Sequence, residues 1–381
     1  MKTARRAKTK APDKQRTTGD FPLTPEQILA KPDIKPKRRP PAHVRKLLST
    51  PRAYFVSRRE IRGTFERIKA PGSRTSTYRL DLPDGAYIGA AGQSRAIMRR
   101  RELERGAKPA LHTSAYCPPW AHRVFRPAAA RMPAPATTLT KDGALITPHS
   151  GVFGADDRVV YYPISYPWCC VGRIFTQVNG KSVGAGTGFL VGPRHVLTAS
   201  HVCPWDAPNW GMLFCPAFYD GNSVAGNGAF SWVSDFRALA NVTAQDSIRA
   251  HDFAVLRLYD PLGDALGWFG TKTYQNSWTG FTFGLHGHPG MIANGQRPAG
   301  QAFIPIVGTA ADGAALELKH QGDASPGNSG SPFWTFWSDN LPYVMGVESA
   351  GRVIPGVEDV NVAAGGAEMV NLLKFWLAGW P

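Results

Sequence analysis

The sequence of 381 residues lacks long hydrophobic runs. No apolar stretch approaches the roughly 18 residues that a membrane-spanning helix needs, so a transmembrane protein is excluded. The basic start is followed by Ala11-Pro12-Asp13-Lys14, not by the apolar core of about 7–15 residues that marks a secretory signal peptide. We therefore expect no such signal at the start of the sequence.

Cysteine is scarce, and its number is odd. Four of the five lie in the C-terminal half, where they allow three disulfide connectivities that the sequence does not distinguish. A metal site of Cys169, Cys170, Cys203 and a histidine is the alternative, but this spacing fits no zinc pattern. His286 and His288 lie two apart on an expected strand, where a structural role is more common than a ligand pair. The five are Cys117, Cys169, Cys170, Cys203 and Cys215.

Acidic residues are few in the first part of the chain. Residues 1–150 hold 32 Lys and Arg against 11 Asp and Glu, a net charge of +21, whereas residues 151–381 hold 12 against 17, a net charge of −5. Two basic, proline-rich stretches within residues 1–50 predict disorder there, and Ser94–Arg105 has a helical pattern. Three interpretations stay open for this half: an arm for nucleic acid or an anionic surface, an inhibitory prosegment, and a solvated extension. Charge alone gives only non-specific affinity, and no nucleic-acid recognition fold is visible.

The C-terminal half has no helix-length segments between its strands. Hydrophobic residues make up 43% of the chain, which excludes a wholly disordered protein, and 40 Gly and 32 Pro favour many turns. Short strand-like runs separated by turns, such as the type I′ signal Asn179-Gly180, predict antiparallel barrels or a sandwich. One amphipathic helix closes the chain. The expected strands are Val171–Val178, Lys181–Val191, Arg194–Ala199, Ala254–Leu258, Phe281–Leu285, Ala302–Val307, Ala315–Leu318 and Tyr343–Glu348.

Three segments of this half carry chemistry. In the first, an expected strand ends in small residues and is followed by His201 at a bend. In the second, Asp252 lies at the start of an expected strand of alternating pattern. Each residue, taken alone, is more often structural. The third centres on Ser329 between Gly327 and Gly330 and is specific, because a nucleophilic hydroxyl needs a tight loop that exposes it and turns nearby N–H groups toward a developing oxyanion. The chain order His, Asp, Ser is that of the double β-barrel triad fold.

Longer stretches around these residues carry a family resemblance. Gly186–His201 contains the histidine, Tyr259–Asp264 follows the aspartate, and Gly287-His288-Pro289-Gly290 lies between the aspartate and the serine. In these stretches, residues 151–381 resemble the trypsin-like serine proteases, and among them the bacterial and fungal glutamyl endopeptidase branch. The resemblance implies an all-β fold of two antiparallel six-stranded β-barrels with a C-terminal helix, preceded by a basic, largely disordered N-terminal extension.

The expected division of the chain follows from composition and from this resemblance. It is a basic low-order extension or prosegment over residues 1–126, a Pro/Ala-rich linker over 127–149 and a peptidase domain over 150–381, with barrel one at about 152–262, barrel two at about 263–364 and the helix at about 365–378.

The resemblance implies a serine endopeptidase that acts by acyl transfer. Ser329 would attack a peptide carbonyl, His201 would take the serine proton, and Asp252 would orient the imidazole. The backbone N–H groups of Gly327 and Ser329 would form the oxyanion hole. No metal or organic cofactor is required; the substrates are proteins or peptides, the expected state is a monomer, and the family implies an extracellular protein.

Three departures from the family bear on these expectations. Asn328 stands where digestive relatives carry an Asp that pairs with a new N-terminal amine, so that switch cannot operate here, and activation by cleavage near Ser150–Val152 is a hypothesis. A bridge between Cys203 and either Cys169 or Cys170 would match the family's bridge beside the histidine.

The substrate pocket is the third departure. Asp323 lies at the position that resembles the base of the trypsin pocket, and Glu348 and Ser349 begin its wall. Because glutamate-cutting members generally have a His where Glu348 stands, the two carboxylates favour Lys or Arg before the cut. Two alternatives remain: a protease-fold binding protein whose site the N-terminal half blocks, and a protease that its basic arm tethers to nucleic acid or an anionic surface.

Overall fold

A computed structural model describes most of the chain. The described residues are 20–50, 64–68, 77–81, 93–106, 112–130, 151–207, 209–243, 249–354 and 358–380. None of the helices in these ranges is long and apolar enough to cross a membrane.

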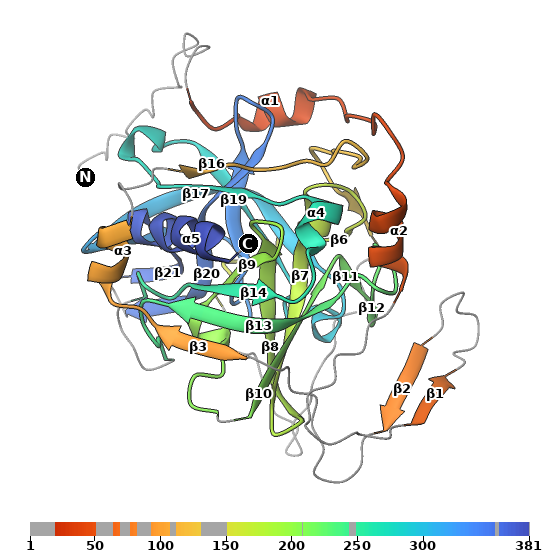
Figure 1. The fold of residues 1–381 in the computed structure, drawn as a ribbon. Helices are drawn as coiled ribbons and strands as arrows, with labels where there is room; N and C mark the ends of the chain where they lie inside the picture. Colours follow the sequence, from red (N-terminus) through yellow and green to blue (C-terminus); the bar gives the residue numbers. More distant parts are fainter. Residues whose placement is uncertain are drawn as a thin grey trace, which may run out of the picture.

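The first barrel is a closed sheet of six antiparallel strands in the order β10-β7-β8-β9-β14-β13, and pairing of β10 with β13 closes it (Figure 1). Asn179 and Gly180 both have positive φ, 51° and 75°, as a type I′ turn between β7 and β8 requires. The strands are β7 (Val171–Val178), β8 (Lys181–Leu190), β9 (His195–Thr198), β10 (Trp210–Pro216), β13 (Ser231–Ala238) and β14 (Ala254–Leu258).

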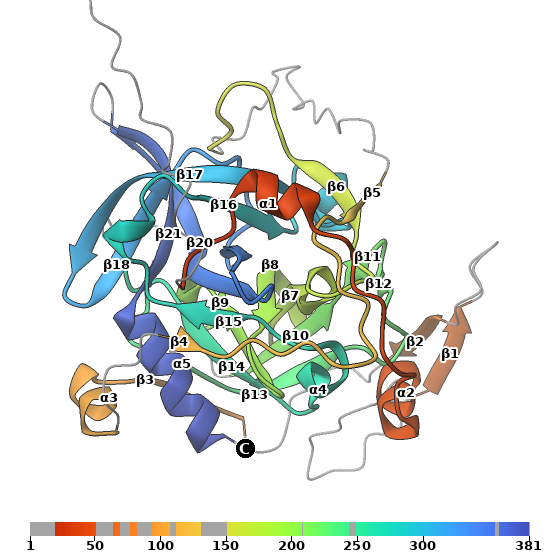
Figure 2. The ribbon, with the colours of Figure 1, turned by 90° about the horizontal axis from the view of Figure 1, so that it is seen from above.

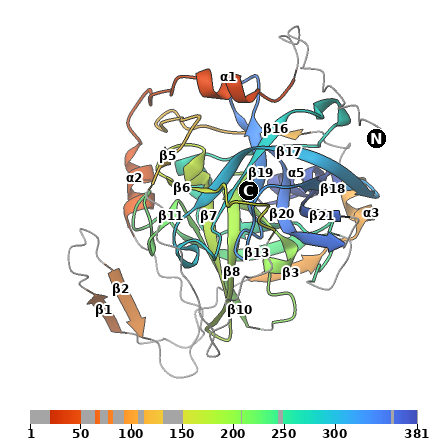
Figure 3. The ribbon, with the colours of Figure 1, turned by 180° about the vertical axis from the view of Figure 1, so that it is seen from behind.

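The second barrel has the strand order β16-β19-β20-β21-β18-β17 and closes through β16 and β17 (Figure 3). The expected fold of two six-stranded antiparallel barrels is therefore confirmed, as is the C-terminal helix, α5. The strands are β16 (Thr282–Gly287), β17 (Ala299–Asp312), β18 (Ala315–His320), β19 (Pro332–Phe336), β20 (Pro342–Ile354) and β21 (Glu358–Gly366).

Shorter elements surround the two barrels. The helices are α1 (Pro25–Ala30), α2 (Ala42–Ser49), α3 (Arg100–Gly106), α4 (Leu262–Leu266) and α5 (Ala367–Gly379). The remaining strands are β1 (Thr64–Ile68), β2 (Thr77–Asp81), β3 (Ser94–Ile97), β4 (His112–Thr113), β5 (Ala128–Ala129), β6 (Val159–Tyr162), β11 (Phe218–Tyr219), β12 (Asn222–Ser223) and β15 (Gly270–Lys272). The 3₁₀ helices are Trp168–Cys170, Ser200–Val202, Asn276–Trp278 and Ala293–Gly295.

Residues 20–50 differ from the disorder that their composition predicts. Helix α1 begins with a capping box, in which Thr24 accepts a hydrogen bond from Gln27 N–H and the Gln27 side chain accepts one from Thr24 N–H. Ile28 of α1 and Val44 of α2 are buried in the core cluster that the barrels share. Seen from above, the segment runs along the side of the molecule from α1 to α2, which packs near α4 (Figure 2). These short helices gain from the barrels the apolar contacts that they cannot make alone.

The expected helix over Ser94–Arg105 is wrong for its first part. Ser94–Ile97 forms β3, which pairs in parallel with β13, and only the helix from Arg100 onward remains. The physical reason lies in barrel one: β10 contacts β13 only at Ser231 and Trp232, so the far end of β13 has an open edge. Strand β3 supplies the missing hydrogen bonds there.

The proposed division into extension, linker and peptidase domain stays a prediction. Of the expected linker, residues 131–149 lie outside the described residues, and Ala128–Ala129 pair with Tyr161–Tyr162 as β5 and β6. Residues 1–19, which carry the first basic stretch, also lie outside them.

Candidate active site

Two cavities, of about 690 and about 540 Å³, meet at His201, Pro326 and Ser329. Side chains of both barrels line them, so the site lies where the barrels face each other. The larger cavity is also lined by Arg249, Glu348, Ser349 and Asp359, and the smaller by Val178, Val183 and Trp205. Among the described residues, none before Gly151 lines either cavity.

His201 and Asp252 are brought together by two paired strands of barrel one. His201 lies in the 3₁₀ helix after β9, and Asp252 lies just before β14, whose Ala254 pairs with Thr198 of β9. His201 Nδ1 is 2.6 Å from Asp252 Oδ2, and the His201 N–H donates to Asp252 Oδ1 at 3.0 Å. Asp252 is fully buried. The carboxylate thus fixes both the main chain and the ring of the histidine and leaves Nε2 for the cavity.

Ser349 contributes a third hydrogen bond to this carboxylate, because its buried hydroxyl donates to Asp252 Oδ2. Ser349 was expected to bind substrate. It does line the larger cavity, but its hydroxyl faces Asp252. Since a carboxylate accepts several hydrogen bonds, Ser349 adds a third donor that holds the buried Asp252 side chain in one orientation.

Ser329 lies in a loop shaped by two glycines with positive φ, Gly327 at 101° and Gly330 at 89°. Thr187 of β8 holds this loop in place: its hydroxyl donates to Gly327 O at 2.8 Å, and its N–H donates to Ser329 O at 2.8 Å. Within the described residues, neither Gly327 N–H nor Ser329 N–H donates to another protein group. Two backbone donors therefore remain available beside the serine hydroxyl. Thr187 lies in the Gly186–His201 stretch, but sequence reasoning assigned it no role in the serine loop.

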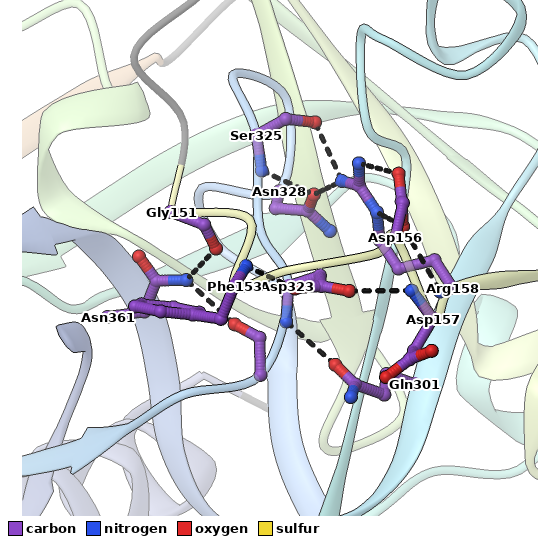
Figure 4. A network of polar contacts seen from close by, with 11 residues as sticks. Gly151, Phe153, Asp156, Asp157, Arg158, Gln301, Asp323, Ser325, Asn328 and Asn361 are labelled. Atoms are coloured by element: carbon purple, nitrogen blue, oxygen red, sulfur yellow. Dashed lines mark hydrogen bonds and ion pairs between the residues drawn. The ribbon is translucent and has the colours of Figure 1, made fainter. Parts of the chain in front are cut away.

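Asp323 does not line the cavity, which corrects the expectation that it forms the base of a substrate pocket. It is only 2% exposed, and its two carboxylate oxygens accept hydrogen bonds from Phe153 N–H and Asp157 N–H at 2.9 and 2.7 Å (Figure 4). The carboxylate therefore satisfies the backbone of the segment that precedes β6. The place of Asp323 in the sequence predicted that it lies near the site, but not where its carboxylate points.

Glu348 lines the larger cavity, as expected, but it has a partner that the sequence did not reveal. Its Oε2 lies 2.9 Å from Nε2 of His320, and both side chains are buried. The ring of His320 in turn stacks on Phe333, with the ring centroids 4.6 Å apart. Glu348 therefore has a buried hydrogen-bond partner in addition to its place in the cavity wall.

All five cysteines are free thiols, so none of the expected bridges is present. Burial raises the pKa of Cys170 and Cys203 well above the ordinary value, and that of Cys215 to about 12. These thiols remain protonated and unreactive at neutral pH. Neither the barrel closure nor the histidine segment depends on a disulfide.

Comparisons with known proteins identify a family and several similar proteases. The family model described as Trypsin matches residues 161–372, more than half of the chain. A glutamyl endopeptidase of Bacillus licheniformis is 26% identical over 182 residues, which are 48% of this chain and 54% of that relative, so the chain spans about half of its length. An extracellular metalloprotease of Bacillus subtilis is 23% identical over 223 residues, 56% of this chain and 67% of that relative. The described residues hold no group of three or more His, Cys, Asp or Glu that could bind a metal.

Solved structures of two proteases are also similar. One, a Glu endopeptidase in complex with MPD, is 21% identical, has a TM-score of 0.47, and matches 60% of this chain and 99% of its own. The other, the protease Anisep from Arthrobacter nicotinovorans, is 18% identical, has a TM-score of 0.40, and matches 58% of this chain and 98% of its own.

Proposed function

The chain belongs to the trypsin family, and from that premise we propose that it is a serine endopeptidase. Ser329 attacks the carbonyl carbon of the scissile peptide bond while His201 accepts the hydroxyl proton through Nε2. His201 then gives that proton to the leaving amine, and water hydrolyses the acyl-enzyme by the reverse sequence. The observation that carries the proposal is the Asp252–His201 bond of 2.6 Å beside a cavity that Ser329 shares.

Asp252 holds the imidazole tautomer that leaves Nε2 free to accept a proton, and it stabilises the imidazolium that forms. The N–H groups of Gly327 and Ser329 stabilise the tetrahedral oxyanion, an interaction that contributes on the order of 3–4 kcal/mol per donor. The positive φ of Gly327, a conformation that other residues rarely adopt, supports a specially shaped loop at this position.

For the residue before the cut we propose Lys or Arg. With Asp323 directed away, the proposal rests on Glu348 and Asp359, two carboxylates in the wall of the larger cavity. They attract a basic side chain and repel an acidic one. The second candidate is glutamate, the residue in the printed name of the Bacillus licheniformis relative, and Arg249 in the same wall favours it.

A panel of peptides that differ only in Lys, Arg, Leu or Glu before the cut tests both parts. We expect kcat/KM for the Lys and Arg peptides to exceed that for the Leu peptide at least about tenfold. We expect Ser329→Ala to lower kcat/KM at least about 10⁴-fold. Glu348→Gln should lower kcat/KM for the Lys and Arg peptides and leave kcat/KM for the Leu peptide unchanged. The highest kcat/KM for Glu establishes the second candidate instead. Absence of cleavage on every peptide overturns the endopeptidase proposal.

The rival functions differ in what they require of the N-terminal half. A binding protein with a blocked site requires residues of the N-terminal half in the cavities, and labelling of Ser329 by a covalent serine probe would support the enzyme instead. A nucleic-acid or anionic-surface tether and the monomeric state stay predictions. Salt-dependent binding of anionic polymers by the full chain would support the tether.

A further inference from the structure

The segment from Gly151 to Arg158 is bound along the loop that carries Ser329 (Figure 4). Gly151 O accepts hydrogen bonds from Ala324 N–H at 3.1 Å and from Asn361 Nδ2 at 2.8 Å. The contacts of Phe153 and Asp157 with Asp323 follow further along the segment. Backbone and side-chain bonds therefore join two stretches about 170 residues apart in the sequence.

Arg158 ends this segment with a fully buried side chain. Its Nε and Nη2 donate to the two carboxylate oxygens of Asp156, at 2.8 and 2.6 Å. Its Nη1 donates to Ser325 Oγ at 2.9 Å and to Asn328 Oδ1 at 3.3 Å. One planar guanidinium thus contacts the segment with one edge and the serine loop with another, which a lysine ammonium cannot do.

The pairing with Asp156 holds this buried guanidinium in place. Burial by itself raises the pKa of Asp156, but the hydrogen bonds and charge of Arg158 outweigh it and the pKa is lowered. Asp156 is therefore ionised at neutral pH. With two of its donor groups occupied by Asp156, the guanidinium has one fixed orientation in which to present Nη1 to the loop.

Asn328 is the residue immediately before Ser329, and its side chain is 1% exposed. Its Oδ1 accepts from Ser325 N–H at 3.0 Å as well as from Arg158, and its own N–H donates to Ser325 O at 2.9 Å. The turn from Ser325 to Asn328 is thus closed on itself and bound to a buried cation. Gly327, the proposed oxyanion donor, lies inside that turn.

We propose that Arg158 is a positioning residue that fixes the Ser325–Asn328 turn and so aligns the Gly327 and Ser329 N–H groups for the oxyanion. This inference rests on the proposed function. An oxyanion donor acts in the transition state more than on bound substrate, so a misaligned turn lowers kcat more than it changes KM.

The test compares Arg158→Met, Asn328→Ala and the double variant in the full chain. Active sites are counted with a fluorophosphonate label, and kcat is expressed per labelled site. Partial unfolding lowers the number of labelled sites but does not change kcat per site. We expect kcat to fall about 10- to 100-fold in each single variant, KM to stay within about twofold, and the double variant to fall no further than the worse single one. Arg297→Met is the matched control, since Arg297 makes a bidentate pair with Asp220 on the surface, and its kcat should be unchanged.

Wild-type kcat per site in a folded Arg158→Met, or losses that multiply in the double variant, overturns the inference. Where Arg158→Met does not fold, the double variant Ser325→Ala/Asn328→Ala decides, because it removes both side-chain contacts of Arg158 with the turn and leaves the Arg158–Asp156 pair intact. Wild-type kcat per site in that variant then overturns the inference. A wild-type chain that neither labels nor cleaves any peptide instead marks a failure of the proposed function.

Discussion

At the scale of single residues, the candidate site combines side chains that sequence motifs predict with side chains that they do not. His201 stands out because it follows the end of a strand, Asp252 because it precedes an alternating strand, and Ser329 because it lies in a glycine-flanked loop. The contacts of Thr187 and Arg158 were not predicted, since their partners lie about 140 to 170 residues away in the sequence. Register sets which side chains meet, and a sequence pattern does not reveal it.

Gly330 and Gly280 allow a prediction about the serine loop. Both have φ near +90°, but a Cβ at Gly330 would lie 2.0 Å from Thr187 O, whereas nothing lies within 4 Å of one at Gly280. We expect Gly280→Ala to lower the free energy of unfolding by about 1–2 kcal/mol through backbone strain, and Gly330→Ala to lower it by at least about 3 kcal/mol and abolish hydrolysis. Urea unfolding of both variants checks this, and equal losses would show that the contact with Thr187 is not tight.

At the scale of elements, the sequence predicted strands where apolar residues alternate, and the structure extends several of them. Strand β17 runs over Ala299–Asp312, and the expectation covered only Ala302–Val307. Strand β3 shows the reverse case. The first part of the helix expected over Ser94–Arg105 forms a strand that pairs with the open edge of β13. The local sequence pattern does not decide the structure there, because hydrogen bonds to a distant strand outweigh helix propensity.

Helices α1 and α2 allow a test of whether the N-terminal segments stabilise the barrels. Val44 is 1% exposed, whereas Leu29 is 47% exposed. We expect Val44→Ala to lower the free energy of unfolding by about 1–3 kcal/mol, and the control Leu29→Ala to change it by less than about 0.5 kcal/mol. Chemical denaturation of the full chain measures both. No effect from Val44→Ala would mean that α2 is not part of the cooperative fold.

At the scale of the whole molecule, the net charge of +16 hides two different parts. The part with the candidate site carries −5, and the +21 lies before residue 151. Composition predicted this division but not its structure, because a proline-rich basic stretch gives no sign of the barrel surface against which it packs. Val44 shows this, since it lies in the second basic, proline-rich stretch and is buried in the core cluster that the barrels share.

Buried histidines predict how stability depends on pH. Burial lowers the pKa of His195 to about 4 and of His286 and His288 to about 3, whereas burial raises that of Asp235 to about 6. Below pH 6.5 the three histidines bind protons in the unfolded state but not in the folded state, so the folded state loses stability as the pH falls. Below pH 6, Asp235 binds a proton in the folded state but not in the unfolded state, which offsets the effect of one histidine. We expect a net loss of about 3 kcal/mol between pH 6 and pH 5. Urea unfolding at the two pH values checks this, and equal free energies would contradict it.

The central claim, that Ser329 is a nucleophile activated by His201 and Asp252, is tested most directly by a covalent serine probe. The full chain is treated with a fluorophosphonate, digested and mapped by mass spectrometry. The account predicts a single phosphonylated residue, Ser329, with labelling abolished by Ser329→Ala and slowed at least about 100-fold by His201→Ala. Absence of label on Ser329 in the folded chain, or a labelling rate that His201→Ala leaves unchanged, would contradict it.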